Sequence, residues 1–437
     1  MRFAQLDDWL RWLETLHPRA IDMGLERTAH VAQTLGINLT MPVLSVAGTN
    51  GKGSCVALAS AIFGAAGYRV GTYTSPHLLR YHERINLAGR TVTDGELLAA
   101  FAAIDSARGS TSLSYFEFGT LAALWLFERA ELDVVVLEVG LGGRLDAVNI
   151  IDADVAIVSS IALDHEAWLG SDREAVGREK AGIFRAGRAA VIGDVDPPQS
   201  LLDYGGDIAA KLHCRNRDFS FSAIRLAWDW RGVDARGEAL VYQNLPLPKL
   251  LIDNAATVLQ ALACLPLAVS EQAIHQGLQQ ASVAGRCQHI DLAGVDIVLD
   301  VAHNPAAVVT LRQHLQSQPV AGKTICVFAV MADKAIAQMC TILQGCFETW
   351  LLATLHDNPR AAQDVDVAAE LRSLQLNNIE CSGDVLTSMQ RAMTLLRAGD
   401  RLVVFGSFFT VAEGMGVLSA WAKSSAKQPS NCSENTL

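Results

Sequence analysis

The sequence predicts an α/β protein of two unequal domains, each built on a mostly parallel sheet. Short apolar runs of strand length recur along the 437 residues, and helical patterns separate them. The same alternation starts again after a stretch of different composition in the middle of the chain. Strands that alternate with helices favour doubly wound folds, and this length suffices for two of them.

The first domain opens with the amphipathic pattern of residues 1–17 and continues as strand–helix units. One helix begins near residue 93, where Thr93 and Glu96 have the spacing of a capping box. Further helices are expected over 52–66 and 115–130. The expected strands are residues 42–48, 68–75, 133–140 and 154–160.

Residues 214–246 alternate aromatic and polar side chains, which predicts short antiparallel strands added to the first domain. Helices are expected to follow over 254–265 and 270–281. The segment SVAGRCQHIDLAG, residues 282–294, has the composition of a turn-rich connector. The predicted first domain is therefore residues 1–286.

The second domain is predicted over residues 287–423 as a smaller doubly wound unit. The polar tail, residues 424–437, contains no aromatic residue and is expected to be disordered. The expected strands of this domain are residues 296–302, 324–330, 349–354 and 401–407.

Composition excludes several classes of partner. The net charge is −11 with no run of Lys or Arg, so the long-range field repels nucleic acid. No apolar run reaches the roughly 20 residues of a membrane span, and the N-terminal segment lacks the features of a signal peptide. The nine cysteines form no CxxC pair. These observations favour a cytoplasmic enzyme that acts on small molecules, and a monomer, because no exposed apolar stripe asks for a partner.

The strongest local signal is GTNGKGS, Gly48 to Ser54, between an expected strand and an expected helix. Glycines let backbone N–H groups close on phosphate oxygens, the helix N-terminus adds positive potential, and Lys52 can reach terminal phosphates. Val46 stands where the strict phosphate-loop pattern has its first glycine, and Gly53 follows the lysine. The alternative is a glycine-rich turn that only caps the helix.

Three further side chains follow expected strands and suit a metal site. Glu138 closes an apolar strand, Ser75 lies in TSPHL, and His165 follows Asp164 in SIALDH. A carboxylate, a hydroxyl and an imidazole at strand ends could form an open octahedral magnesium site. The alternatives are a Glu138–Arg144 ion pair, a turn role for Ser75 and a structural histidine.

Two other motifs carry weaker signals. Lys180 in GREKAGIFR has charged neighbours, so a solvated helix face is its default interpretation. In LDVAHNP, Asp300, His303 and Asn304 follow a strand and run into a helix, where doubly wound folds meet ligands. His303 could equally be a cap or turn residue.

These motifs, together with SYFEFGT, DNAATVLQAL and FGSFFTV, occur in the order typical of one family. From about Leu16 to about Gly416 the chain resembles the folylpolyglutamate and dihydrofolate synthases of the Mur ligase superfamily. The resemblance implies an N-terminal P-loop ATPase domain, similar to the central domain of Mur ligases, and a C-terminal Rossmann-like domain. The chain departs from the family pattern at Cys287 and in VMADKA, residues 330–335.

The resemblance also implies roles for individual residues. Lys52, His165 and Lys180 would be catalytic, with Lys180 matching a lysine that becomes carbamylated in the family. Ser75, Glu138 and His165 would organise Mg²⁺. The positions that match ATP-binding residues are Thr49, Asn50, Gly51, Lys52, Gly53, Ser54, Asn254, Arg286 and Asp300. The positions that match substrate-binding residues are Ile21, Asp22, Met23, Ser114, Phe116, Leu145, Asp146, Ala147 and His303.

The implied activity joins L-glutamate to dihydropteroate, which gives dihydrofolate, and to tetrahydrofolate or its polyglutamates. ATP would activate the acceptor carboxylate as an acyl phosphate, with Mg²⁺ as cofactor and the need for a monovalent cation such as K⁺ left open. A cell-wall Mur ligase is disfavoured because only 47 residues precede Gly48. A nucleotide-binding switch without ligase activity is the rival from another class.

Overall fold

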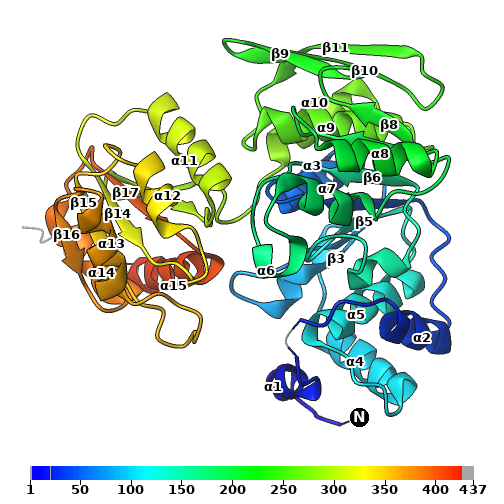
Figure 1. The fold of residues 1–437 in the computed structure, drawn as a ribbon, viewed down its shortest axis with the longest axis horizontal. Helices are drawn as coiled ribbons and strands as arrows, with labels where there is room; N and C mark the ends of the chain where they lie inside the picture. Colours follow the sequence, from blue (N-terminus) through cyan, green and yellow to red (C-terminus); the bar gives the residue numbers. More distant parts are fainter. Residues whose placement is uncertain (1, 20, 426–437) are drawn as a thin grey trace, which may run out of the picture. The chain divides into compact units, whose positions relative to one another are not determined.

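The computed structural model describes residues 2–19 and 21–425, which form two units, one up to Val283 and one from Ala284 on (Figure 1). The expected boundary, between residues 286 and 287, lies close to this division. Most of the expected tail, from residue 426 on, lies outside the described residues.

The first unit contains, within the described residues, an eight-stranded sheet in the order β4-β3-β2-β5-β1-β6-β7-β8. From β2 to β8 every neighbouring pair is parallel, and β3 and β4 extend the edge as an antiparallel hairpin. The expected parallel sheet is thus confirmed. The strands are β1 Val43–Ala47, β2 Val70–Tyr73, β3 Ile85–Leu87, β4 Arg90–Thr91, β5 Val134–Glu138, β6 Val155–Val158, β7 Ala189–Ile192 and β8 Lys211–Cys214.

Helices cover both faces of this sheet, which explains why its central strands are apolar at nearly every position. In β5, Val135 and Leu137 join one core cluster, whereas Val134 and Val136 join the cluster on the opposite face. The helices are α1 Leu6–Leu16, α2 Glu26–Leu35, α3 Lys52–Ala65, α4 Asp94–Arg108, α5 Tyr115–Arg129, α6 Glu166–Leu169, α7 Arg173–Ala181, α8 Gln199–Asp207, α9 Ile252–Ala263 and α10 Glu271–Gln280.

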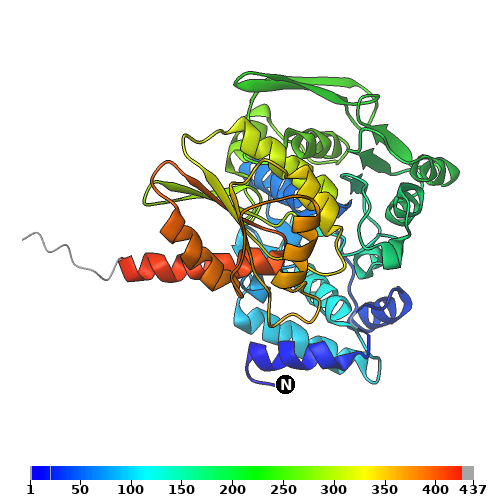
Figure 2. The ribbon, with the colours of Figure 1, turned by 60° about the vertical axis from the view of Figure 1, so that its left-hand side comes forward.

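The aromatic-rich segment forms the expected antiparallel sheet, with β9 Ser220–Ile224, β10 Ala227–Val233 and β11 Ala239–Pro246 in the order β11-β10-β9. Figure 2 shows it as the long ribbon arm of the first unit. Trp230 on β10 is fully buried, and its indole N–H donates to the carbonyl of Ala256 on α9 at 3.0 Å. This contact anchors the arm to α9.

The second unit has a six-stranded sheet within the described residues, in the order β12-β13-β17-β14-β15-β16, with all pairs from β13 to β16 parallel. Its strands are β12 Gln288–Leu292, β13 Val295–Asp300, β14 Thr324–Phe328, β15 Thr349–Leu352, β16 Ile379–Cys381 and β17 Arg401–Phe405. Its helices are α11 Pro305–Ser317, α12 Ile336–Ile342, α13 Asp364–Ser373, α14 Val385–Leu395 and α15 Phe408–Ser425.

The expectation of a turn-rich connector at residues 282–294 is wrong for its second half. Gln288–Leu292 is the antiparallel edge strand β12, paired with β13. Its polar residues His289 and Asp291 are exposed in alternation with Ile290 and Leu292, a half-solvated pattern that lacks the apolar run of a central strand.

No helix in the described part of the chain is long and apolar enough to cross a membrane.

Candidate active site

The glycine-rich segment turns sharply between β1 and α3. Gly48 and Gly51 have φ values of 151° and 88°, which favour glycine. A Cβ atom at Gly48 would lie 1.9 Å from the hydroxyl oxygen of Ser159, and one at Gly51 would lie 2.6 Å from Oδ1 of Asn254. Both positions therefore exclude a side chain, and Asn254 on α9 lies directly against the loop.

The two residues between these glycines are fixed by the segment that follows β6. The backbone N–H of Thr49 donates to the carbonyl of Ser160 at 2.7 Å, and its hydroxyl exchanges hydrogen bonds with the backbone of Ala162. The hydroxyls of Ser159 and Ser160 both donate to the carbonyl of Asn50. Sequence reasoning missed these serines, and their only signal was a polar pair at a strand end.

Lys52 begins α3 and curls back over the loop. Its Nζ donates to the carbonyls of Gly48 and Thr49 at 3.0 and 3.3 Å. The first turn of α3 contains no acidic residue, so the helix N-terminus is positive on the side of this ammonium group. Gly53 and the buried Ser54 follow in the same turn. The arrangement has the properties of an anion site and exceeds what a capping turn requires.

Glu138 is the last residue of β5 and is buried beside the loop. Its Oε2 accepts the backbone N–H of Ser75 at 3.1 Å, and a Cβ added to Gly53 would lie 3.6 Å from the same oxygen. Arg144 pairs with Glu179 at 2.8 Å, so the alternative of a Glu138–Arg144 ion pair is wrong. The carboxylate of Glu138 and Ser75 thus lie together at the carboxyl ends of β5 and β2.

His165 lies in the segment that holds Thr49. It is exposed, has a φ of 53° and precedes α6, and its backbone N–H donates to the carboxylate of Asp164. In the described part of the chain, no cluster of three or more His, Cys, Asp or Glu side chains could hold a metal. A cation near Glu138 would therefore need hydroxyl, water or phosphate oxygens to complete its coordination.

Lys180 contradicts the expected solvated helix face, because its side chain is almost completely buried on α7. Burial and the positive charge of Lys52 lower its pKa from 10.5 to about 7, although Asp164 and Asp146 act in the opposite direction. Part of the Lys180 population is therefore a neutral amine near neutral pH. The charged sequence neighbours of Lys180 concealed this burial.

Asp146 organises the turn that follows β5. It is buried, which raises its pKa from 3.8 to about 6, and it accepts the backbone N–H groups of Leu141 and Val148 at 2.9 and 3.0 Å. The neighbouring Ala147 is buried, and the carbonyl of Leu145 accepts the N–H of Gly24 at 3.3 Å. The turn is thereby joined to the segment that contains Ile21, Asp22 and Met23.

The remaining expected substrate residues of the first unit surround this turn. Phe116 on α5 covers Gly140, since a Cβ there would lie 2.6 Å from its ring. Ser114 caps α5. Asp22 pairs with Arg27 at 2.8 Å, and its pKa is lowered: burial acts to raise it, but Arg27, His17 and Arg19 outweigh that effect. The structure therefore brings the three expected acceptor segments together.

The second unit holds the other expected residues at the carboxyl end of β13. Asp300 is buried and accepts the N–H groups of Cys287 and Ala302 at 2.7 and 2.8 Å. The guanidinium carbon of Arg286 lies 5.1 Å from the centre of the Phe408 ring. His303 Nδ1 lies 2.8 Å from the carbonyl of Val301, and Asn304, not His303, caps α11.

Comparisons with known proteins give one consistent result. Residues 285–408 match the model of the Mur ligase, glutamate ligase domain. The chain is 45% identical to the dihydrofolate synthase/folylpolyglutamate synthase of Escherichia coli over 418 residues, covering 95% of this chain and 96% of that one. The corresponding Haemophilus influenzae protein is 40% identical, with 95% and 98% covered.

Solved structures agree with the sequences. E. coli FolC in complex with DHPP and ADP is 44% identical and superposes with a TM-score of 0.91, covering 96% of this chain and 99% of that one. A bifunctional folylpolyglutamate synthase/dihydrofolate synthase with Mn, AMPPNP and L-glutamate bound is 44% identical with a TM-score of 0.88, covering 95% and 98%.

Proposed function

The chain belongs to the dihydrofolate synthase/folylpolyglutamate synthase family, and we propose that the residues described above carry out that family's reaction in it. It is an ATP-dependent ligase that joins L-glutamate to folates, with ATP and a divalent metal as its small-molecule requirements. The finer proposal is that it accepts both dihydropteroate and tetrahydrofolate or its polyglutamates. The observation that carries the residue assignment is the convergence of the Gly48–Ser54 loop, Glu138 and Lys180 in one unit.

The loop suits the triphosphate of ATP. Residues 51–54 offer backbone N–H groups and the Lys52 ammonium to phosphate oxygens, whereas the N–H groups of Thr49 and Asn50 donate to Ser160 and hold the loop in shape. Asn254 borders the loop. Arg286 and Asp300 of the second unit are proposed as further nucleotide contacts, and His303 as a glutamate-side residue. Their support is the resemblance of GR and LDVAHNP to the family motifs.

Glu138, Ser75 and His165 are proposed to hold Mg²⁺. The oxygen donors of Glu138 and Ser75 fit this ion, and the small Gly53 leaves space beside the Glu138 carboxylate. His165 would add an imidazole nitrogen, and its support is the resemblance to the family motif. When bound, the ion neutralises charge on the phosphate oxygens and orients them. K⁺ is a further candidate. Lys180, once carbamylated, would present a carboxylate to the same region.

The chemistry needs no covalent enzyme nucleophile. An oxygen of the acceptor carboxylate attacks the γ-phosphorus of ATP, and the bond to the ADP oxygen breaks. The neutral amine of L-glutamate then attacks the acyl phosphate carbon, phosphate leaves, and the nitrogen releases a proton. Lys52 would stabilise the negative charge that develops on the transferred phosphoryl group.

The test is ADP release by the purified protein with Mg-ATP and L-glutamate. Dihydropteroate, tetrahydrofolate and no acceptor are compared. We expect release with both acceptors and none without. ADP release with only one acceptor would show that the protein has one of the two activities. ADP release that is the same with and without an acceptor would favour the nucleotide-switch alternative.

The proposed setting is a cytoplasmic monomer that binds small molecules and neither nucleic acid nor membrane. The acidic net charge of −11 supports the exclusion of nucleic acid. Sedimentation equilibrium of the purified protein tests the oligomeric state, and a mass of twice 46.9 kDa would contradict the monomer.

A further inference from the structure

Arg84 is a buried cation in the first unit whose charge no carboxylate balances. The residue is 8% exposed, and no acidic group in the described chain forms an ion pair with its guanidinium. By contrast, the partly buried Arg27 of the same unit pairs with both Asp22 and Glu117. Arg84 closes the short 3₁₀ helix Tyr81–Arg84, which leads into β3.

The groups around the guanidinium are neutral. Its Nε donates to Nδ1 of His77 at 2.8 Å, and that nitrogen can accept only when it carries no proton. The guanidinium carbon lies 5.4 Å from the centre of the Tyr81 ring and 5.6 Å from that of Tyr115. Aromatic faces attract a cation but do not neutralise it. A buried charge without a counter-ion is unfavourable, so an anion that reaches this position gains an unusually strong interaction.

Arg84 lies between the two halves of the proposed site. Its carbonyl accepts the backbone N–H of Thr74 at 2.9 Å, and the next residue, Ser75, contacts Glu138. On its other side, Tyr115 stands between Ser114 and Phe116, the expected acceptor residues. The guanidinium itself contacts His77, two residues after Ser75, and Tyr115, so its neighbours come from both the segment of the proposed metal ligand Ser75 and the acceptor wall.

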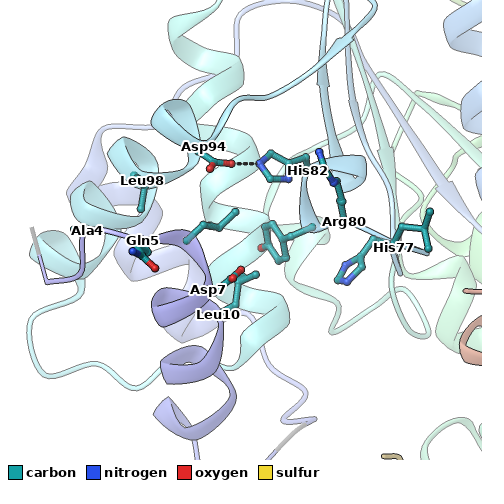
Figure 3. A pocket seen from close by; sticks show the side chains of 12 residues that line it. Ala4, Gln5, Asp7, Leu10, His77, Arg80, His82, Asp94 and Leu98 are labelled. Carbon is teal, nitrogen blue, oxygen red and sulfur yellow. Dashed lines mark hydrogen bonds and ion pairs between the residues drawn. The ribbon is translucent and has the colours of Figure 1, made fainter. Parts of the chain in front are cut away.

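Two of the side chains that contact the Arg84 guanidinium border a cavity that Arg84 itself does not line. His77 and Tyr81 also line a cavity of about 530 Å³ between the start of α1, residues 77–82 and the start of α4. Figure 3 shows His77, Arg80 and His82 along one wall of this cavity, with Asp94 paired to His82 and Asp7 on the helix opposite. The residues that enclose the guanidinium are therefore not packed into the core on every side.

We propose that Arg84 binds the α-carboxylate of the terminal glutamyl residue of a folate acceptor and so selects for the chain-extension reaction. This inference rests on the proposed function. A folate acceptor carries two carboxylates on that residue, and the γ-carboxylate reacts. A pteroate acceptor carries only the reacting carboxylate.

The dimensions agree with this role. The two carboxyl carbons of a glutamyl residue are about 5 Å apart, by ordinary bond lengths. The backbones of Arg84 and Thr74 are joined by a hydrogen bond of 2.9 Å, as in adjacent strands, and such strands lie about 5 Å apart. The span of a glutamyl residue thus matches the spacing of the two segments, and the proposal places its γ-carboxylate near Ser75 and Glu138 and its α-carboxylate at the Arg84 guanidinium.

The test compares steady-state ADP release with dihydropteroate and with tetrahydrofolate for the wild type, Arg84→Met and Arg84→Lys. Methionine keeps an unbranched apolar side chain and removes the charge, whereas lysine restores the charge. Arg90→Met is the matched control, because Arg90 is exposed and paired with Glu96. Thermal unfolding of all variants reports whether they fold.

For Arg84→Met we expect kcat/KM to fall about 100-fold with tetrahydrofolate, mainly through KM, and less than about threefold with dihydropteroate, since a charge-assisted pair is lost for one acceptor only. Arg84→Lys should recover part of the loss. An equal loss with both acceptors, or no loss with either, would overturn the inference. If Arg84→Met does not fold, the same comparison is made with Arg84→Lys: the loss of kcat/KM with tetrahydrofolate is compared with the loss with dihydropteroate. A wild type inactive with both acceptors would instead refute the proposed function.

Discussion

Lys180 offers the sharpest test of the proposed site, because the structure gives both the sign and the size of the expected effect. Its pKa is lowered from 10.5 to about 7 in the folded protein. The free-energy difference is about 5 kcal/mol at roughly 1.4 kcal/mol per tenfold change in proton affinity. Below pH 7 this whole amount opposes folding, because both states are charged. Above pH 10.5 both states are neutral, and the cost vanishes.

Replacing Lys180 by Met removes this cost while keeping most of the buried volume. We expect Lys180→Met to be more stable than the wild type by several kcal/mol at pH 6.5, and the gain to shrink steadily toward pH 10.5. Urea unfolding followed by circular dichroism, in buffers free of bicarbonate, measures both. A variant that is less stable than the wild type at every pH would refute the reasoning.

Activity should move in the opposite direction from stability. A neutral amine is the form that adds carbon dioxide, and a lysine with a pKa of 10.5 is neutral in only about 0.03% of molecules at pH 7. Lys180, with its pKa near 7, is neutral in about half. Carbon-13 NMR of the wild type in labelled bicarbonate should show a carbamate signal that Lys180→Met lacks, and ADP release should fall at least about 100-fold. An unlabelled wild type, or a fully active variant, would exclude carbamylation.

Three other predictions concern residues near the same loop. Glu138→Gln should reduce metal-dependent ADP release at least about 100-fold while the melting temperature changes little, and isothermal titration with Mn²⁺ should show weaker binding. Gly51→Ala should weaken ADP binding, because the new Cβ meets Asn254 at a φ of 88°; a cost above about 1 kcal/mol is expected in fluorescence titration, and unchanged binding would contradict the geometry. The pKa of Asp146 is raised to about 6, so its ionisation disfavours folding above pH 6 and not below pH 3.8; Asp146→Asn should flatten this part of the stability profile, and a profile identical to that of the wild type would refute the assignment.

Much of the fold could be predicted from the sequence, because strands that are buried on both faces of a sheet appear as short apolar runs. Strands such as β1 and β5 are apolar at nearly every position. The loop after β1 has glycines at the positions where the chain turns sharply. The edge strand β12 escaped prediction because one side of it faces water and its polar residues resemble those of a loop. Its pairing with β13 depends on contacts that the local sequence does not contain.

Candidate site residues could be proposed from the sequence where the residue type and its position suggest a role. They could not be proposed where the role depends on burial in the folded protein. Glu138 at a strand end and Lys52 after glycines could be proposed from their positions alone, and the structure places both beside the Gly48–Ser54 loop. Lys180 and Arg84 look like ordinary surface cations in the sequence, and only tertiary packing shows that both are buried. Ser159 and Ser160 have no distinctive pattern, although they fix the loop through Asn50.

The hydrogen bonds from Ser159 and Ser160 to the Gly48–Ser54 loop have a thermodynamic consequence. A loop that is already held in shape loses little conformational freedom when a triphosphate arrives, so less of the favourable enthalpy of those contacts is offset by entropy. The dipoles of its N–H groups also point in a fixed direction beforehand, which limits reorganisation during each turnover. Removing both hydroxyls together should therefore make nucleotide binding entropically less favourable, even though neither serine needs to contact the ligand.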